Sequence, residues 1–297
     1  MKLATFRVGQ RSSVGVVIED GLVDLTSLDP RLPRSLRALL EAGPEALEAV
    51  RRLATNAPRR LPLHEARLLA PIPEPRKFLG LGFSYRSHVE EIRARRKDIV
   101  IPPNQVWFTK QVSCVNGPFD DIHKPPISDM LDYEGELALV IGRRCRHLKA
   151  NSAREVIAGY MICNDVSVRD WQLRAPTATL GKSFDTHGPT GPWLTLAEEV
   201  EDPENLSLKT WVSGELRQNG STSDFIYTIG QMLEELTTVM TLEPGDILTT
   251  GSPGGVGAAM VPPCYLSVGD VVRIEIQALG AIENRVVPEP APTATPP

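Results

Sequence analysis

Glycine and proline are frequent along the whole chain, and they limit what it can fold into. The 297 residues include 23 Gly and 26 Pro, together about 16% of the sequence, whereas soluble proteins average roughly 12%. Aromatic residues make up only 5%. Because Gly and Pro interrupt helices and mark turns, this composition favours a strand-rich fold with many tight connections over a helix bundle.

The charge and hydropathy of the chain argue against several classes of protein. The formal net charge is −5 and the pI is near 5.7, whereas a nucleic-acid binder needs a basic surface for phosphates. No run approaches the roughly 18 apolar residues that indicate a membrane span. Residues 1–7 become polar too early for a signal peptide. We therefore expect a cytoplasmic protein with no nucleic-acid or membrane partner.

The N-terminal part of the chain has the pattern of a small α+β domain. Alternating apolar and polar residues predict strands over residues 2–8 and 13–19. Apolar residues at helical spacing predict two short helices within residues 34–53. Five prolines between residues 57 and 75 indicate a connecting arm. We expect a domain of residues 1–72.

The larger part, residues 73–287, is expected to be a catalytic domain built mostly of strands. Ser87 and Glu90 form a capping-box pattern, which predicts a helix from Ser87 to about residue 97. A second helix is expected over residues 226–239. The last ten residues, 288–297, contain five prolines and are expected to form a disordered tail. Strands are predicted over residues 77–83, 105–109, 135–141, 159–164, 206–212, 246–250 and 271–277.

Two glutamates in one predicted strand form the most informative pair. Glu134 and Glu136 are two residues apart, so their side chains project from the same face of the strand. That face continues with apolar Ala138 and Val140. If it is buried, the two carboxylates need a cation or a shared proton. The alternative is an exposed strand end at which water solvates both.

A second polar cluster follows the predicted strand 159–164. If a helical turn begins at Asp165, then Asp165, Arg169 and Gln172 lie on one face of it. An acid, a guanidinium and an amide presented together could serve a metal ion and an anionic substrate. The alternative is a helix N-cap at Asp165 with a surface ion pair to Arg169.

Two glycine-rich segments and one helical pair complete the set of candidates. Lys182 lies in a Gly/Pro-rich segment, but its spacing is not that of a nucleotide-binding loop, which argues against nucleotide binding. Residues 249–257 form a second segment, which either directs backbone N–H groups at an anion or is only a tight bend. His88 and Glu91 are three residues apart on the predicted helix, so their side chains can reach each other. The pair could be a general base with its carboxylate partner, or two neighbouring side chains in solvent.

Taken in order, these motifs resemble the fumarylacetoacetate hydrolase family from about residue 77 to residue 287. The resemblance implies an α+β, predominantly β fold, in which a mixed β-roll surrounds a metal site and a small α+β domain precedes it. It also implies a homodimer. The motifs are Tyr85-Arg86-Ser87-His88, Asp132-Tyr133-Glu134-Gly135-Glu136-Leu137, Asn164-Asp165-Val166-Ser167-Val168-Arg169-Asp170, Gly181-Lys182-Ser183-Phe184-Asp185, Gly188-Pro189-Thr190-Gly191-Pro192 and Thr250-Gly251-Ser252-Pro253-Gly254-Gly255.

The resemblance also implies roles for single residues. Acidic residues at the family's metal positions would bind Mg²⁺, Mn²⁺ or Ca²⁺, since hard cations prefer oxygen ligands. A further lysine and a His–Glu pair would be catalytic, the pair lying on a lid that continues over residues 93–103. Serine stands where the family usually has the second threonine of Thr-Gly-Thr-Pro. The metal ligands are Glu134, Glu136 and Asp165, the catalytic residues are His88, Glu91 and Lys182, and the substrate-binding residues are Arg169, Gln172, Tyr85, Thr250 and Ser252.

The activity implied by the resemblance is hydrolysis of a carbon–carbon bond in a small acidic substrate, a 2,4-diketo acid of the acylpyruvate type. A metal-stabilised enolate is the shared intermediate of this family's reactions. The same site could therefore serve an isomerase, a tautomerase or a decarboxylase of a hydroxymuconate-type or 2-oxo diacid. A third possibility is a metabolite-binding relative without catalysis, against which the His88 and Glu91 pair argues.

Overall fold

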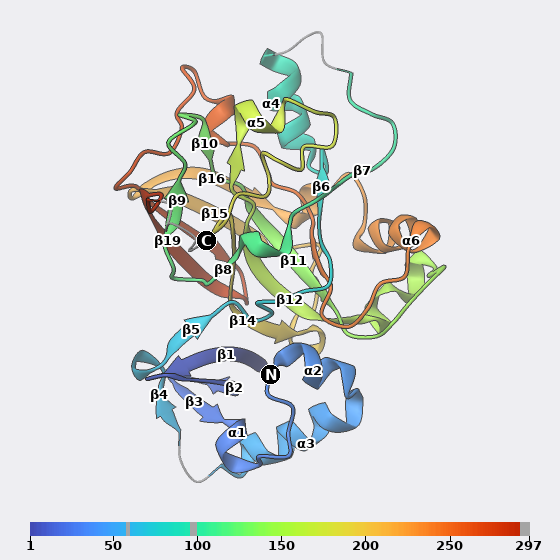
Figure 1. The fold of residues 1–297 in the computed structure, drawn as a ribbon. Coiled ribbons are helices and arrows are strands. Elements are labelled where there is room, and N and C mark those ends of the chain that lie inside the picture. Colours follow the sequence, from blue (N-terminus) through green and yellow to red (C-terminus); the bar gives the residue numbers. More distant parts are fainter. Residues whose placement is uncertain (58–59, 96–99, 292–297) are drawn as a thin grey trace, which may run out of the picture.

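One mixed sheet of twelve strands joins the N-terminal residues to the rest of the chain (Figure 1). In the computed structural model, which describes residues 1–57, 60–95 and 100–291, its main path is β4-β3-β2-β1-β14-β12-β11-β17-β6-β7, with β5 beside β1 and β8 beside β14. The strands are β1 (Lys2–Val8), β2 (Arg11–Ile18), β3 (Gly21–Asp24), β4 (Leu61–Pro62), β5 (Arg67–Leu69), β6 (Phe78–Gly82), β7 (Val106–Thr109), β8 (Val115–Asn116), β11 (Gly135–Ile141), β12 (Ile157–Asn164), β14 (Gly188–Leu196) and β17 (Ile247–Thr249).

Two smaller sheets complete the predominantly β body. A five-stranded sheet has the order β16-β15-β18-β19-β9, and a two-stranded sheet joins β10 to β13. These strands are β9 (Ile122–Lys124), β10 (Leu131–Asp132), β13 (Ser167–Val168), β15 (Ser207–Val212), β16 (Glu215–Ser221), β18 (Val271–Ile276) and β19 (Gly280–Pro288).

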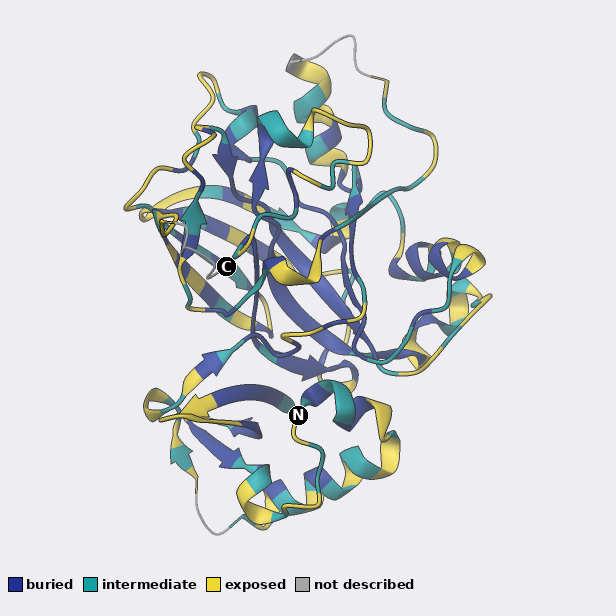
Figure 2. Ribbon diagram, in the orientation of Figure 1, coloured by how far each residue is buried: buried dark blue, intermediate teal, exposed yellow. Residues whose placement is uncertain are grey.

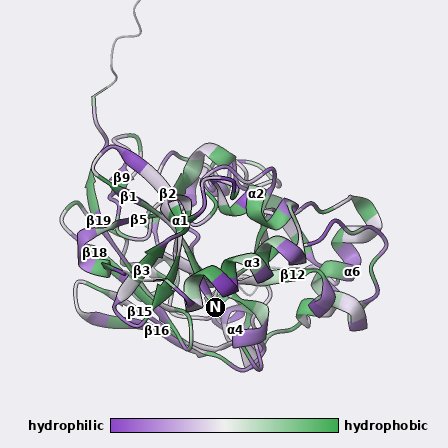
Figure 3. Ribbon diagram, turned by 90° about the horizontal axis from the view of Figure 1, so that it is seen from below, coloured by the Kyte–Doolittle hydropathy of each residue, from purple (hydrophilic) through white to green (hydrophobic). Residues whose placement is uncertain are grey.

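The helices lie around the sheets. Figure 1 places α4 and α5 at the end of the body opposite the N-terminal segment, and Figures 1 and 3 both place α6 at its side. Among the described residues, no helix combines the length and the apolar character needed to cross a membrane. The α-helices are α1 (Leu25–Leu28), α2 (Leu36–Glu41), α3 (Pro44–Thr55), α4 (Arg86–Arg95), α5 (Arg169–Gln172) and α6 (Ile229–Val239).

The N-terminal segment shares its sheet and one of its cores with the body. The two helices predicted within residues 34–53 are confirmed as α2 and α3, which pack Leu36, Leu39 and Val50 into the same cluster as Ala138 of β11. Strand β1 pairs with β14 of the body, with Leu3 opposite Leu194. The N-terminal residues therefore extend the central sheet.

Strands β11 and β12 form the buried centre of the molecule (Figure 2). Every residue of β11 is buried, and alternate side chains enter two different cores, Leu137 and Leu139 one and Ala138 and Val140 the other. Such a strand packs apolar side chains on both faces. A carboxylate at its start is therefore mostly buried.

Most predicted strands are confirmed, but several short strands and three strands of more than four residues were not predicted. The three longer strands are β14, β16 and β19. Strand β14 contains two Gly-Pro pairs, Gly188-Pro189 and Gly191-Pro192, although proline rarely occurs within a sheet. Gly191-Pro192 lies where the pairing of β12 with β14 shifts register, between Tyr160 and Ile162, and Gly188-Pro189 lies where β14 pairs with β8. The tail expected over 288–297 starts inside β19, which ends at Pro288, and its residues 292–297 lie outside the described residues.

The capping box predicted at Ser87 and Glu90 is wrong, although the helix itself is confirmed as α4. Helix α4 is described from Arg86 to Arg95, so it starts one residue before Ser87. Residues 96–99, which belong to the predicted end of the helix and to the predicted lid, lie outside the described residues. The backbone N–H of Ser87 donates instead to the Oδ2 atom of Asp224, at 2.9 Å. A carboxylate at this end of a helix satisfies a free N–H group and favours the helix dipole. A tertiary contact has therefore replaced the local cap.

Candidate active site

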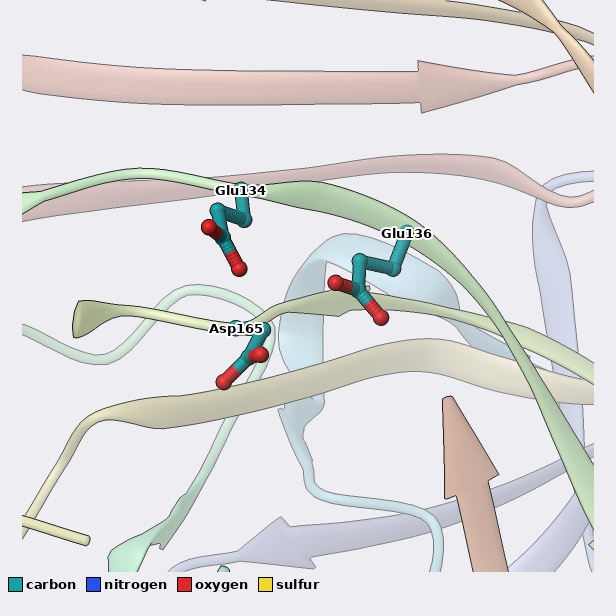
Figure 4. Close-up of side chains that lie close together, drawn as sticks. All are labelled: Glu134, Glu136 and Asp165. Carbon is teal, nitrogen blue, oxygen red and sulfur yellow. The ribbon is translucent and has the colours of Figure 1, made fainter. Parts of the chain in front are cut away.

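The antiparallel pairing of β11 with β12 brings three carboxylates together. Gly135 at the start of β11 lies opposite Asn164 at the end of β12, so Glu134 and Asp165 are neighbours, and the N–H of Asp165 donates to the carbonyl of Glu134 at 2.9 Å. Glu136 lies on the same face of its strand as Glu134. Figure 4 shows the three side chains directed toward a common space, and one ligand oxygen from each lies within 4.8 Å of the others.

Two buried lysines neutralise part of this acidic cluster. Lys182 Nζ lies 2.5 Å from Glu134 Oε2 and 2.6 Å from Asp165 Oδ2. Lys110 follows β7, and its Nζ lies 2.6 Å from Asp165 Oδ1 and 2.6 Å from the carbonyl oxygen of Lys182. Both side chains are almost fully buried. Burial lowers the pKa of Lys110, but Asp165 more than offsets this and raises it above its usual value.

An arginine and a fourth carboxylate close the cluster on its other side. Arg169, the first residue of α5, binds Asp132 through Nε at 2.8 Å and Glu134 through Nη1 at 2.6 Å. Its Nη1 also donates to Oε1 of Gln172, at 3.0 Å. Burial raises the pKa of Glu134, but Arg169 and Lys182 more than compensate and hold it below its usual value. Glu134 is therefore ionised.

The net charge of the cluster fits a divalent cation. Three cationic side chains, Lys110, Lys182 and Arg169, face four buried carboxylates, which leaves one negative charge. Glu136 is the carboxylate of the four that is least favoured as an anion without a cation, because burial and repulsion from Asp165 and Glu134 raise its pKa well above the usual value. A cation held by Glu134, Glu136 and Asp165 would remove that repulsion. The all-oxygen ligand set suits Mg²⁺, Mn²⁺ or Ca²⁺ better than zinc.

The helical turn expected to begin at Asp165 is wrong. Ser167–Val168 form strand β13, which pairs with β10, and the helix starts only at Arg169. Asp165 and Arg169 are therefore not on one helical face, and Asp165 binds the two lysines rather than Arg169. Arg169 and Gln172 do share a helical turn and a hydrogen bond.

The glycine-rich segment after β17 donates its N–H groups to carboxylates of the protein itself. The N–H of Gly251 donates to Glu136 Oε2 at 2.9 Å, and that of Gly257 to Asp132 Oδ1 at 2.8 Å. The N–H of Gly255 donates to both carboxylate oxygens of Glu91, at 3.1 and 3.2 Å. Of the two interpretations of this segment, the anion-binding one is confirmed. These bonds tie helix α4 to the acidic cluster.

His88 and Glu91 lie side by side at the edge of the cluster. His88 Nδ1 is 3.5 Å from Glu91 Oε2, longer than a normal hydrogen bond but within ion-pair range. Both side chains are mostly buried, with exposed fractions of 15% and 23%. Glu91 is fixed by Gly255, and His88 reaches the cavity described next. The pair is therefore positioned to exchange protons with a bound molecule.

A cavity of about 760 Å³ opens directly onto the cluster. Seven of the eleven residues predicted to act in the site line it, and Glu91, Asp165, Tyr85 and Thr250 do not. Asp165 lies behind the lining in contact with Lys110 and Lys182, and Tyr85 and Thr250 are buried in the core. Tyr85 packs edge to face on Phe225 with ring centroids 4.8 Å apart, and Thr250 donates its hydroxyl to the carbonyl of Leu137. The predicted residues that line the cavity are His88, Glu134, Glu136, Arg169, Gln172, Lys182 and Ser252.

Three polar residues of the site were not singled out from the sequence. Lys110 and Asp132 are described above. The third is Gln218 in β16, whose Nε2 donates to Ser252 Oγ at 2.7 Å and whose Oε1 accepts from the N–H of Gly135 at 2.9 Å. Lys110 and Gln218 lie far from the cluster in sequence, so local spacing gives no signal for them. Asp132 stands in the quoted motif beside Glu134, and that proximity could have identified it.

The comparison with known families decides the classification of the chain. Residues 77–287 match the profile described as "Fumarylacetoacetate (FAA) hydrolase C-terminal". The chain belongs to the fumarylacetoacetate hydrolase family. Members of the family are enzymes that include hydrolases, isomerases and tautomerases. The resemblance noted in the sequence and the predominantly β fold are therefore confirmed.

Three relatives illustrate this range of activities. Rat (Rattus norvegicus) oxaloacetate tautomerase Fahd2a, mitochondrial, is 39% identical over 94% of this chain and 87% of its own. The maleylpyruvate hydrolase of Sphingobium sp. SYK-6, solved with manganese(II) and pyruvate, is 34% identical, with a TM-score of 0.81 over 97% of this chain and 99% of its own. A probable 2-hydroxyhepta-2,4-diene-1,7-dioate isomerase of Mycobacterium abscessus is 31% identical, with a TM-score of 0.81 over 98% of this chain and 100% of its own.

Proposed function

We propose that this family member is a metal-dependent tautomerase of a small 2-oxo diacid such as oxaloacetate. The observation that carries the proposal is that His88, whose imidazole is a suitable general base, lines the same cavity as the buried cluster of Glu134, Glu136 and Lys182. Similarity to a curated oxaloacetate tautomerase over 94% of the chain supports this substrate.

The residues of the cavity have separate roles in the proposed reaction. A divalent cation held by Glu134, Glu136 and Asp165 would supply Lewis-acid polarisation of the 2-keto oxygen, and the manganese in the Sphingobium hydrolase supports that assignment. In the direction from keto to enol, His88 removes a proton from the carbon next to the keto group and the 2-oxygen takes up a proton from water; in the reverse direction the 2-oxygen releases its proton to water and His88 returns one to the carbon. Lys182 offsets the negative charge that develops on the 2-oxygen.

Hydrolysis of an acylpyruvate is the second candidate, and the contact between His88 and Glu91 favours it. In that reaction Glu91 orients His88, and His88 takes a proton from water. The resulting hydroxide adds to the distal carbonyl, after which the carbon–carbon bond breaks and the leaving carbon is protonated. The Sphingobium maleylpyruvate hydrolase, 34% identical, supports this alternative.

The homodimer and the cytoplasmic location stay predictions, and the rat relative is named mitochondrial.

An ultraviolet assay with product analysis tests both candidates. Enol oxaloacetate, acetylpyruvate and fumarylpyruvate are each incubated with the protein and Mn²⁺, with and without EDTA. Loss of the enol absorbance faster than in buffer, with no change in mass, is the expected result. Release of pyruvate with an organic acid would establish the hydrolase instead, and carbon dioxide would indicate a decarboxylase. Absence of any metal-dependent change would overturn the proposed function.

A further inference from the structure

One cationic side chain in the cavity has no acidic partner. Arg169 and Lys182 are held by the carboxylates of the cluster. Arg174 also lines the cavity, but no carboxylate of the described residues binds it. Within the part of the chain that the structure describes, carboxylates of the protein already neutralise Arg169 and Lys182, whereas the charge of Arg174 is free to bind a ligand. The cavity therefore suits a ligand that carries an additional negative charge.

The guanidinium of Arg174 is held by an aromatic platform. Its Cζ lies 3.6 Å from the ring centroid of Trp171, and Trp171 packs edge to face on Phe184 with centroids 5.6 Å apart. Stacking occupies the flat face of a guanidinium and leaves its N–H edge available for a carboxylate. Trp171 belongs to α5, the helix that also carries Arg169. Arg174 lies two residues beyond the end of α5, so this short helix and the turn after it place both arginines at the same cavity.

We propose that Arg174 binds the second carboxylate of a dicarboxylic substrate and so makes the site selective for 2-oxo diacids over 2-oxo monoacids. This inference rests on the proposed function, because the 2-oxo acid end of the substrate is assigned to the acidic cluster. The distal carboxylate then reaches the outer part of the cavity. Arg174 is a specificity-determining residue, and the proton transfer does not depend on it.

The test compares two ligands that differ only in the distal carboxylate group. L-malate and L-lactate share a 2-hydroxy acid end, and their dissociation constants are measured by isothermal titration calorimetry in the presence of Mn²⁺. The wild type is expected to bind malate at least about tenfold more tightly than lactate, the usual effect of one charge-assisted contact. Arg174→Gln should bring that ratio close to one, and Arg174→Lys should restore only part of it, since lysine lacks the planar stacking group.

Arg7→Gln is the matched control, because Arg7 is an exposed arginine in β1 and its loss changes the net charge equally. It should leave the ratio at the wild-type value. Equal binding of malate and lactate by the wild type, no binding of malate, or an unchanged ratio in Arg174→Gln would each overturn the inference. The ratio does not depend on turnover. Malate selectivity that requires Arg174 in a protein without tautomerase activity would refute the proposed function and support the inference.

Discussion

Lys110 and Asp165 are 55 residues apart in the chain, yet Lys110 Nζ lies 2.6 Å from Asp165 Oδ1 with both side chains fully buried. Lys182 occupies the other oxygen of the same carboxylate. Asp165 is thus oriented by two lysines from different parts of the chain, Lys110 directly after β7 and Lys182 between α5 and β14. The arrangement fixes one proposed metal ligand before any ligand binds.

Lys110→Met should therefore destabilise the protein, because it leaves a buried carboxylate with an unpaired oxygen. Removing one partner of a buried ion pair costs about 3 kcal/mol or more, and urea unfolding measures the loss. Lys209→Met is the matched control, since Lys209 is exposed in β15, and it should change the free energy of unfolding by less than about 0.5 kcal/mol. Equal effects of the two substitutions would contradict the assigned role of Lys110.

His88→Gln should lower kcat by about a hundredfold or more, the usual contribution of a general base. The affinity of the variant for Mn²⁺ should stay close to that of the wild type, because the proposed metal ligands are Glu134, Glu136 and Asp165 and His88 is not among them. Stopped-flow measurement of enol decay gives kcat, and metal titration gives the affinity. Full turnover in the variant would remove His88 from the mechanism.

Glu136→Gln should abolish stabilisation of the protein by Mn²⁺. A ligand at about 100 times its dissociation constant stabilises the folded state by about 2.7 kcal/mol, which thermal unfolding detects in the wild type. Glu235→Gln, at an exposed position on α6, removes the same charge and should keep the full shift. If Glu136→Gln keeps it too, the metal does not bind at this cluster.

Stability should fall with acid because of His187, which was assigned no role from the sequence. Burial lowers the pKa of His187 from 6.5 to about 3, so below pH 6.5 the unfolded chain binds a proton that the folded chain does not. The loss begins as pH falls through 6.5 and continues to about pH 3. Between pH 6.5 and about pH 4 the wild type should lose about 3 kcal/mol more than His187→Gln. Urea unfolding measures the free energy of unfolding of both proteins at each pH. Equal losses in the wild type and in His187→Gln would show that His187 is protonated in the folded protein.

The sequence was sufficient to predict the parts of the site that are close in the chain. Glu134 and Glu136 share a face because strand geometry demands it, and the resemblance supplied Asp165. Lys110 and Gln218 were missed because sheet pairing, not local spacing, brings them to the cluster. The same reason explains the cap of α4, where Asp224 from a distant turn replaces the predicted Ser87 side chain. Tyr85 was assigned to the substrate by its motif, but the fold buries it against Phe225.

Strand β14 follows the segment that carries Lys182, and its far end is covered by β1 through the pairs Lys2 with Thr195 and Leu3 with Leu194. Without β1, the backbone N–H and C=O groups at that end would be open to another chain. Strand β1 therefore covers backbone groups of β14 that would otherwise be unpaired at this end. A shortened protein that lacks the first 72 residues would tend to aggregate through β14 even if every residue of the acidic cluster were intact.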